Sequence, residues 1–69
     1  MIDIKDIHDH LVCKADELTG YIEASYKKQT TRIHLPVGES FQIERFGTVT
    51  IIIRDSPTTF KVKRLALIA

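Results

Sequence analysis

The sequence predicts an α+β fold, in which an N-terminal α-helix is followed by a four- or five-stranded antiparallel sheet that is strongly bent or barrel-like. Two observations support this prediction. Apolar residues recur every three or four positions before Gly20, which is the helical period, and every second position after it, which is the period of half-buried strands. The 69 residues suffice for a single domain, residues 1–69, and closing so small a sheet would protect its edges.

The predicted helix covers about residues 4–18. Asp3 is a suitable N-cap, because its carboxylate can accept hydrogen bonds from the free amides of the first helical turn. Ile2 and Ile7 could form a hydrophobic staple around that cap, and Gly20 suits the C-terminal end of the helix. The apolar stripe of this helix would consist of Ile4, Ile7, Leu11, Ala15 and Leu18.

Alternation of apolar and polar residues after Gly20 predicts five strands separated by turn residues. They cover about residues 21–27, 30–35, 41–45, 48–54 and 59–66. Residues 21–26 could instead continue the helix, because neither Lys28 nor Gln29 favours the positive φ of a tight turn. In the last strand the alternation slips at Arg64 and Leu65, which indicates either a β-bulge or a tail that docks against a neighbour.

Composition indicates an ordinary globular protein, with 43% hydrophobic and 28% charged residues. The apolar runs are far shorter than a membrane span, and the N-terminus lacks an apolar leader, so we expect no membrane association. Cys13 is the only cysteine, which excludes an intramolecular disulfide and fits a cytoplasmic location. Because a chain of this size has a small core, we also expect a homo-oligomer.

No catalytic residue, metal site, cofactor or small-molecule substrate is predicted. His8 and His10 are two positions apart, and on a helix they would point in nearly opposite directions and could not hold one ion. Cys13 is expected on the exposed, acidic face of the helix, where a thiolate is disfavoured. The three glycines are isolated, so there is no phosphate-binding loop. These observations favour a non-enzymatic binding module.

The charges are sorted along the chain, with acids concentrated in residues 1–25 and bases in residues 26–69, although the formal net charge is only +1. Such asymmetry is a hint of a surface that binds polyanions. We therefore expect first a nucleic-acid-binding accessory or regulatory protein, acting by counterion release at a basic sheet face. Its phosphate contacts would be Lys27, Lys28, Arg32, Lys61, Lys63 and Arg64. This expectation requires these side chains to converge on one surface.

The alternative is a protein–protein interaction module, such as an inhibitor, an adaptor or a self-assembling subunit. The acidic helix face and the basic sheet face would complement each other between two copies. Ile52 is expected to face outward, opposite to Ile51 and Ile53, and the C-terminal strand has more apolar residues than a thin core needs. The predicted interface residues are Ile52, Leu65, Leu67, Ile68 and Cys13.

Overall fold

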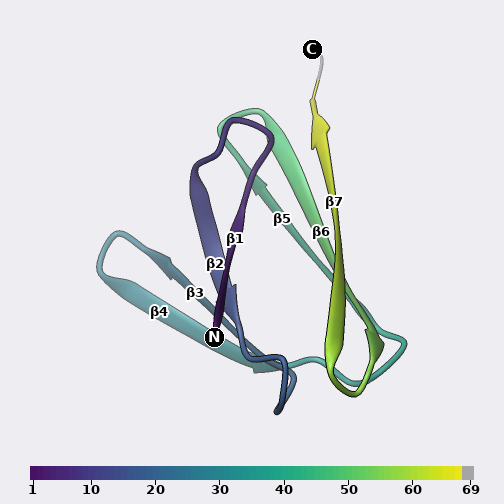
Figure 1. The fold of residues 1–69 in the computed structure, drawn as a ribbon. Helices are drawn as coiled ribbons and strands as arrows, with labels where there is room; N and C mark the ends of the chain where they lie inside the picture. The colour runs from purple at the N-terminus through teal and green to yellow at the C-terminus, as the bar shows by residue number, and fades with distance from the viewer. Residues whose placement is uncertain (68–69) are drawn as a thin grey trace.

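The computed structural model describes residues 1–67, and these residues form an all-β fold of two antiparallel sheets (Figure 1). The first sheet has the order β1-β2-β3-β4 and the second the order β5-β6-β7. The strands are β1 (Ile2–Lys5), β2 (Leu11–Ala15), β3 (Tyr21–Tyr26), β4 (Gln29–His34), β5 (Ser40–Arg45), β6 (Thr48–Ser56) and β7 (Thr59–Ala66). Each of the five expected strands overlaps one of β3 to β7. No helix that could cross a membrane is found in residues 1–67.

The predicted N-terminal helix is wrong, and with it the α+β class, because residues 4–18 contain the end of β1, the β1–β2 turn, all of β2 and part of the turn after it. Asp6 is buried, and its Oδ1 accepts hydrogen bonds from the backbone N–H groups of His8 and His10 at 2.8 and 2.9 Å. The Asp6 N–H donates to the His10 carbonyl at 2.9 Å, and Asp9 has a φ of 66°. Local bonds of this kind compete with helical bonds and favour a turn.

Apolar spacing was misleading here because it also satisfies the strand period. In β1 and β2 the inward residues are Ile2, Ile4, Cys13 and Ala15, which face each other across the hairpin as the pairs Ile2↔Ala15 and Ile4↔Cys13. A bulge follows Ile4, so that Val12 and Cys13 are both buried. Residues that the helical stripe needed inside, Ile7, Leu11 and Leu18, are exposed.

Gly20 ends the second turn rather than a helix. Its N–H donates to the Asp16 carbonyl at 2.8 Å, and the Asp16 N–H donates to the Tyr21 carbonyl at 2.8 Å. The φ of Gly20 is +80°, and a Cβ there would collide with the guanidinium of Arg54. Arg54 is buried and donates to the carbonyls of Leu35 and Pro57, each at 3.0 Å. This arginine therefore ties the linker after β4 to the second sheet.

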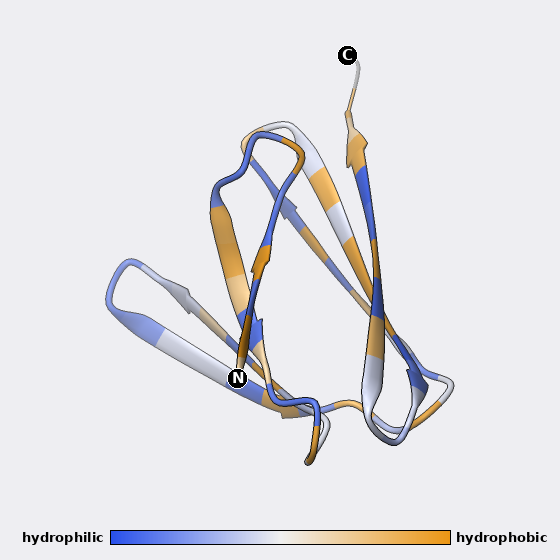
Figure 2. Cartoon of the chain, viewed as in Figure 1, coloured by the Kyte–Doolittle hydropathy of each residue, from blue (hydrophilic) through white to orange (hydrophobic). Residues whose placement is uncertain are grey.

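The core lies between the two sheets and contains mainly aliphatic side chains. Figure 2 shows that hydrophobic residues recur along strands of both sheets. In β6 the inward residues are Thr48, Thr50 and Ile52. The face of this strand that is turned to the core is therefore the one that was expected to face solvent. Ile52 pairs with Phe41 on one side and Val62 on the other, which are also inward residues. Because β6 has apolar residues on both faces, its sequence alone does not define which face is buried.

The sheets are not closed into a barrel, which corrects the expected barrel-like shape. β2 and β3 pair only through Lys14↔Glu23 and Ala15↔Ile22. Beyond those pairs the β1–β2 and β3–β4 hairpins fan apart (Figure 1). The β3–β4 hairpin is thereby held away from the second sheet, and the edge strands β4 and β5 diverge from the linker that joins them.

Candidate binding cleft

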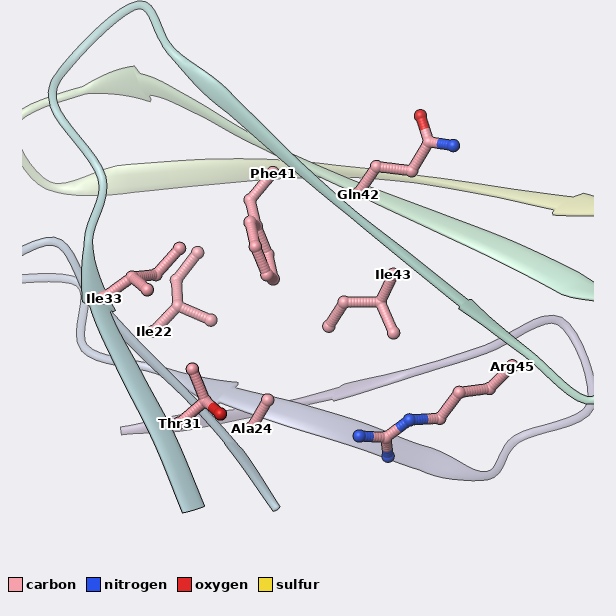
Figure 3. Close-up of a pocket in the computed structure, with 8 residues that line it drawn as sticks. All are labelled: Ile22, Ala24, Thr31, Ile33, Phe41, Gln42, Ile43 and Arg45. Atoms are coloured by element: carbon pink, nitrogen blue, oxygen red, sulfur yellow. The ribbon is translucent and has the colours of Figure 1, made fainter. Parts of the chain in front are cut away.

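A cleft of about 240 Å³ lies between the β3–β4 hairpin and β5 (Figure 3). Its lining residues are Ile22, Ala24, Thr31, Ile33, Phe41, Gln42, Ile43 and Arg45. Figure 3 shows Phe41, Ile43 and Arg45 of β5 pointing toward the β3–β4 hairpin, whereas Gln42 points away from it. The cleft is therefore mainly apolar, with one cationic side chain at its end.

The alternation of the strands explains this lining. Ile22 pairs with Ile33 and Ala24 pairs with Thr31, which places all four on the inward face of the hairpin. Ala24 and Thr31 are smaller than the isoleucines beside them, so the side chains leave space opposite Ile43. The hollow is a result of small residues at inward positions on a hairpin that stands away from β5.

Arg45 connects this cleft to a second, more open hollow of about 450 Å³, which is lined by Tyr26, Glu44, Arg45 and Phe46. The Arg45 guanidinium carbon lies 5.0 Å from the centre of the Tyr26 ring, and Lys27 Nζ lies 5.4 Å from the same centre. Within residues 1–67 the Arg45 guanidinium makes no ion pair with a carboxylate. The mouth of the cleft thus presents an aromatic ring with two cations.

The backbone of β5 adds hydrogen-bonding groups beside the cleft. The β5–β6 hairpin closes at Phe46 and Gly47, with φ values of 51° and 72°, and Arg45 pairs with Thr48 across this two-residue turn. In such a ladder alternate residues direct their N–H and C=O groups to the partner strand. Those of Ser40, Gln42 and Glu44 therefore point to the other side, where β5 has no neighbouring strand within residues 1–67.

Cys13 is only 3% exposed, which corrects the prediction of an exposed thiol at an interface. Burial raises the pKa of Cys13 to about 11, and the positive charge of Arg45 opposes this shift. The thiol is therefore protonated at neutral pH.

The six cations predicted to bind nucleic acid are distributed over several surfaces. Lys27 and Lys28 form the tip of the β3–β4 hairpin, with φ values of 48° and 66°. Arg32 is on the outer face of the first sheet, in a row of alternating charge, and its guanidinium carbon lies 4.8 Å from the centre of the Tyr21 ring. The row across the four strands is Asp3, Lys14, Glu23 and Arg32.

The three cations of β7 are on both faces of the second sheet. Lys61 and Lys63 pair with Ile53 and Ile51, which places them on its outer face, and Lys61 Nζ lies 3.9 Å from an oxygen of Asp55. Arg64 is on the opposite face, where its Nε donates to the Lys5 carbonyl at 2.7 Å. The structure brings together Lys27 with Lys28 and Lys61 with Lys63, and it does not gather all six.

The predicted protein interface is also divided. Ile52 is 0% exposed, which corrects its expected outward position. Leu65 and Leu67 are about half exposed, and Ile68 lies outside the described residues. Phe46 is 75% exposed in the turn that ends at Gly47.

The histidines of the first turn do not form a metal site. His10 Nδ1 lies 3.6 Å from Asp6 Oδ2, and within residues 1–67 there is no group of three or more His, Cys, Asp or Glu side chains that could hold a metal ion. The backbone hydrogen bond from His10 is the main cause that holds the pKa of Asp6 below its usual value, with a further contribution from the bond of His8.

No family model, no curated protein and no solved structure matches this chain.

Proposed function

We propose that this chain is a non-enzymatic protein-interaction module that binds an extended polypeptide segment along β5. The observation that supports it best is the combination of a free strand edge and an apolar cleft on the same side of β5. A bound strand would form hydrogen bonds with the backbone of Ser40, Gln42 and Glu44. Its alternate side chains would enter the cleft, as in other cases where a peptide adds a strand to a sheet.

The size of the cleft favours side chains over a small-molecule ligand. Pockets for drug-sized ligands occupy roughly 300–1,000 Å³, whereas this cleft measures about 240 Å³, and the adjoining hollow of about 450 Å³ is more open. That volume suits one or two apolar side chains. A free small molecule would also leave the backbone groups of the β5 edge unused.

Nucleic-acid binding stays a prediction from the charge pattern. The polypeptide is preferred because the predicted phosphate contacts are spread over several surfaces. Self-assembly is one form of the same proposal, since a second copy could supply the strand. A cytoplasmic location is part of the proposal and is supported by the single cysteine.

Selection from a random library of displayed eight-residue peptides tests this proposal with the complete chain as bait. Peptides that are enriched are then synthesised, and amide hydrogen exchange of the chain is measured with and without them. We expect slower exchange at the amides of Gln42 and Glu44, because these N–H groups become bonded to the added strand. No enrichment, or protection elsewhere on the chain, would overturn the proposal.

Two pairs of variants localise the binding. Ala24→Leu fills the cleft and should weaken peptide binding at least tenfold, whereas Ser25→Leu, on the opposite face of the same strand, should leave it unchanged. Gln42→Pro removes the outward N–H of an edge strand and adds a ring on the side of the incoming strand, so it should weaken binding at least tenfold as well. Gln42→Ala is its control for the loss of the glutamine side chain. Thermal unfolding of each variant verifies that it is folded. Equal binding by Ala24→Leu and Ser25→Leu would exclude the cleft.

A further inference from the structure

We infer that the segment bound along β5 carries an Asp or Glu side chain that pairs with Arg45, two residues away from an apolar side chain that fills the cleft. This inference rests on the proposed function and specifies its partner: an extended polypeptide with the pattern apolar–any residue–acidic, read in either direction. The acid and the apolar residue are two apart because alternate residues of a strand share a face.

The state of Arg45 points to an anionic group. A guanidinium has five N–H donors, and its preferred partner is a carboxylate bound through two parallel hydrogen bonds. Arg45 is partly buried, lines both hollows and makes no ion pair within residues 1–67. A cation in this position is stabilised when a ligand supplies the opposite charge.

The orientation of Arg45 is already restricted in the free chain. Its guanidinium lies over the Tyr26 ring, at 5.0 Å from the ring centre, which is a favourable cation–π distance. Figure 3 shows the side chain extending from β5 toward the β3–β4 hairpin, at the end of the apolar lining. A restricted guanidinium loses less conformational entropy when it binds a carboxylate.

The surroundings of Arg45 are positive on the side of the cleft. Lys27 Nζ is 5.4 Å from the same ring centre, and Lys28 follows it at the hairpin tip. Glu44 is the acidic residue at the mouth, but it alternates with Arg45 in β5 and so belongs to the outer face. Cys13 is protonated at neutral pH because its pKa is about 11, so the thiol does not neutralise Arg45. The local charge therefore attracts an acid.

The position of the acid follows from β5. Phe41, Ile43 and Arg45 are successive inward residues of this strand. A strand paired with β5 would place its own inward side chains beside them at the same spacing. The side chain beside Ile43 enters the space above Ala24 and Thr31, and the next inward side chain reaches Arg45. The edge of β5 thus predicts an apolar residue beside Ile43 and an acidic residue beside Arg45, two positions apart in the bound segment.

The test uses the peptides selected on the complete chain, each synthesised with its acid and with the corresponding amide. For the unaltered chain we expect the change from Glu to Gln to weaken binding about tenfold, as for the loss of a charge-assisted bond in a partly exposed site. Arg45→Met should bind the acidic peptide about tenfold more weakly and should no longer distinguish acid from amide. Arg45→Lys, which keeps the charge without the planar fork, should retain part of the preference.

The two proposals fail in different ways. Peptides that protect the β5 edge but show no acidic preference, or a preference that Arg45→Met retains, would overturn this inference and leave the proposed function intact. Absence of protection at β5 would overturn the proposed function itself. Displacement of the bound peptide by a single-stranded oligonucleotide at physiological salt, with loss of acid selectivity, would show that phosphate is the anion recognised and would also overturn the inference.

Discussion

Substitution of Gly20 by alanine should destabilise this chain far more than the addition of one methyl group suggests. The φ of Gly20 is +80°, which costs an L-residue about 1 kcal/mol. A Cβ would also collide with the Arg54 guanidinium and would lie 2.9 Å from the Leu35 carbonyl oxygen. Arg54 then has to leave its bond with that carbonyl, and loss of a charged hydrogen bond costs about 1.5–3 kcal/mol.

The sum for Gly20→Ala is about 2.5–4 kcal/mol, a large fraction of the roughly 5–15 kcal/mol by which domains are stable. Urea denaturation followed by circular dichroism measures it as a lower midpoint at similar slope. Gly38→Ala is the matched control, because Gly38 has a φ of +89° but no atom within 4 Å of a Cβ. It should cost only the conformational term, about 1 kcal/mol. Equal losses in the two variants would refute the contact between Gly20 and Arg54.

Three further predictions concern the turns and the thiol. Replacing Lys27 and Lys28 by Asn and Gly relieves two left-handed lysines and should raise stability by about 1–2 kcal/mol in thermal unfolding, and an unchanged midpoint would contradict the turn geometry. The pKa of Asp6 is lowered in the fold, so its stabilisation is present above the ordinary value of 3.8 and is lost as the pH falls through the folded pKa. Asp6→Asn should remove that part of the acid dependence, measured by denaturation from pH 6 down to about 2, and a profile identical to that of the unaltered chain would contradict it. The pKa of Cys13 is raised to about 11 in the folded chain, against 9.0 for an ordinary thiol. Its contribution to the free energy of unfolding is therefore complete below pH 9.0 and is lost as the pH rises toward 11. Native Cys13 should therefore react with iodoacetamide at pH 8 much more slowly than in urea, and equal rates would contradict its burial.

The strand pattern after Gly20 could be predicted because a period of two is distinct when turns interrupt it every few residues. The first twenty residues could not be assigned in the same way, because Ile4 and Ala15 fit both a helix and a hairpin. Asp6 and Asp16 favour the hairpin over the helix, because their side chains accept hydrogen bonds from the backbone N–H groups two residues ahead and so stabilise turns. Reading Asp16 to Gly20 as a turn instead of a helix end would have predicted an all-β chain.

The cleft was not predictable from local patterns. It depends on the angle between two hairpins and on which face of β6 is buried, and both are settled by packing between distant segments. Tyr26 and Arg45 are nineteen positions apart and meet because the β3–β4 hairpin and β5 lie on opposite sides of the cleft. The charge asymmetry was visible in the sequence, but the surfaces on which its members lie are determined by register, which composition does not contain.

The short pairing between β2 and β3 determines how easily the β3–β4 hairpin can move relative to β5. Within residues 1–67, β3 is joined to β2 by two register pairs, Lys14↔Glu23 and Ala15↔Ile22, and by the bond from the Asp16 N–H to the Tyr21 carbonyl. The β3–β4 hairpin itself is held by six pairs. A small rotation at this junction would change the separation of Ala24 from Ile43 without breaking any pairing within either hairpin. The width of the cleft between Ala24 and Ile43 therefore depends on the short pairing between β2 and β3. Substitutions at that pairing would change which side chains the cleft accepts, although they lie outside it.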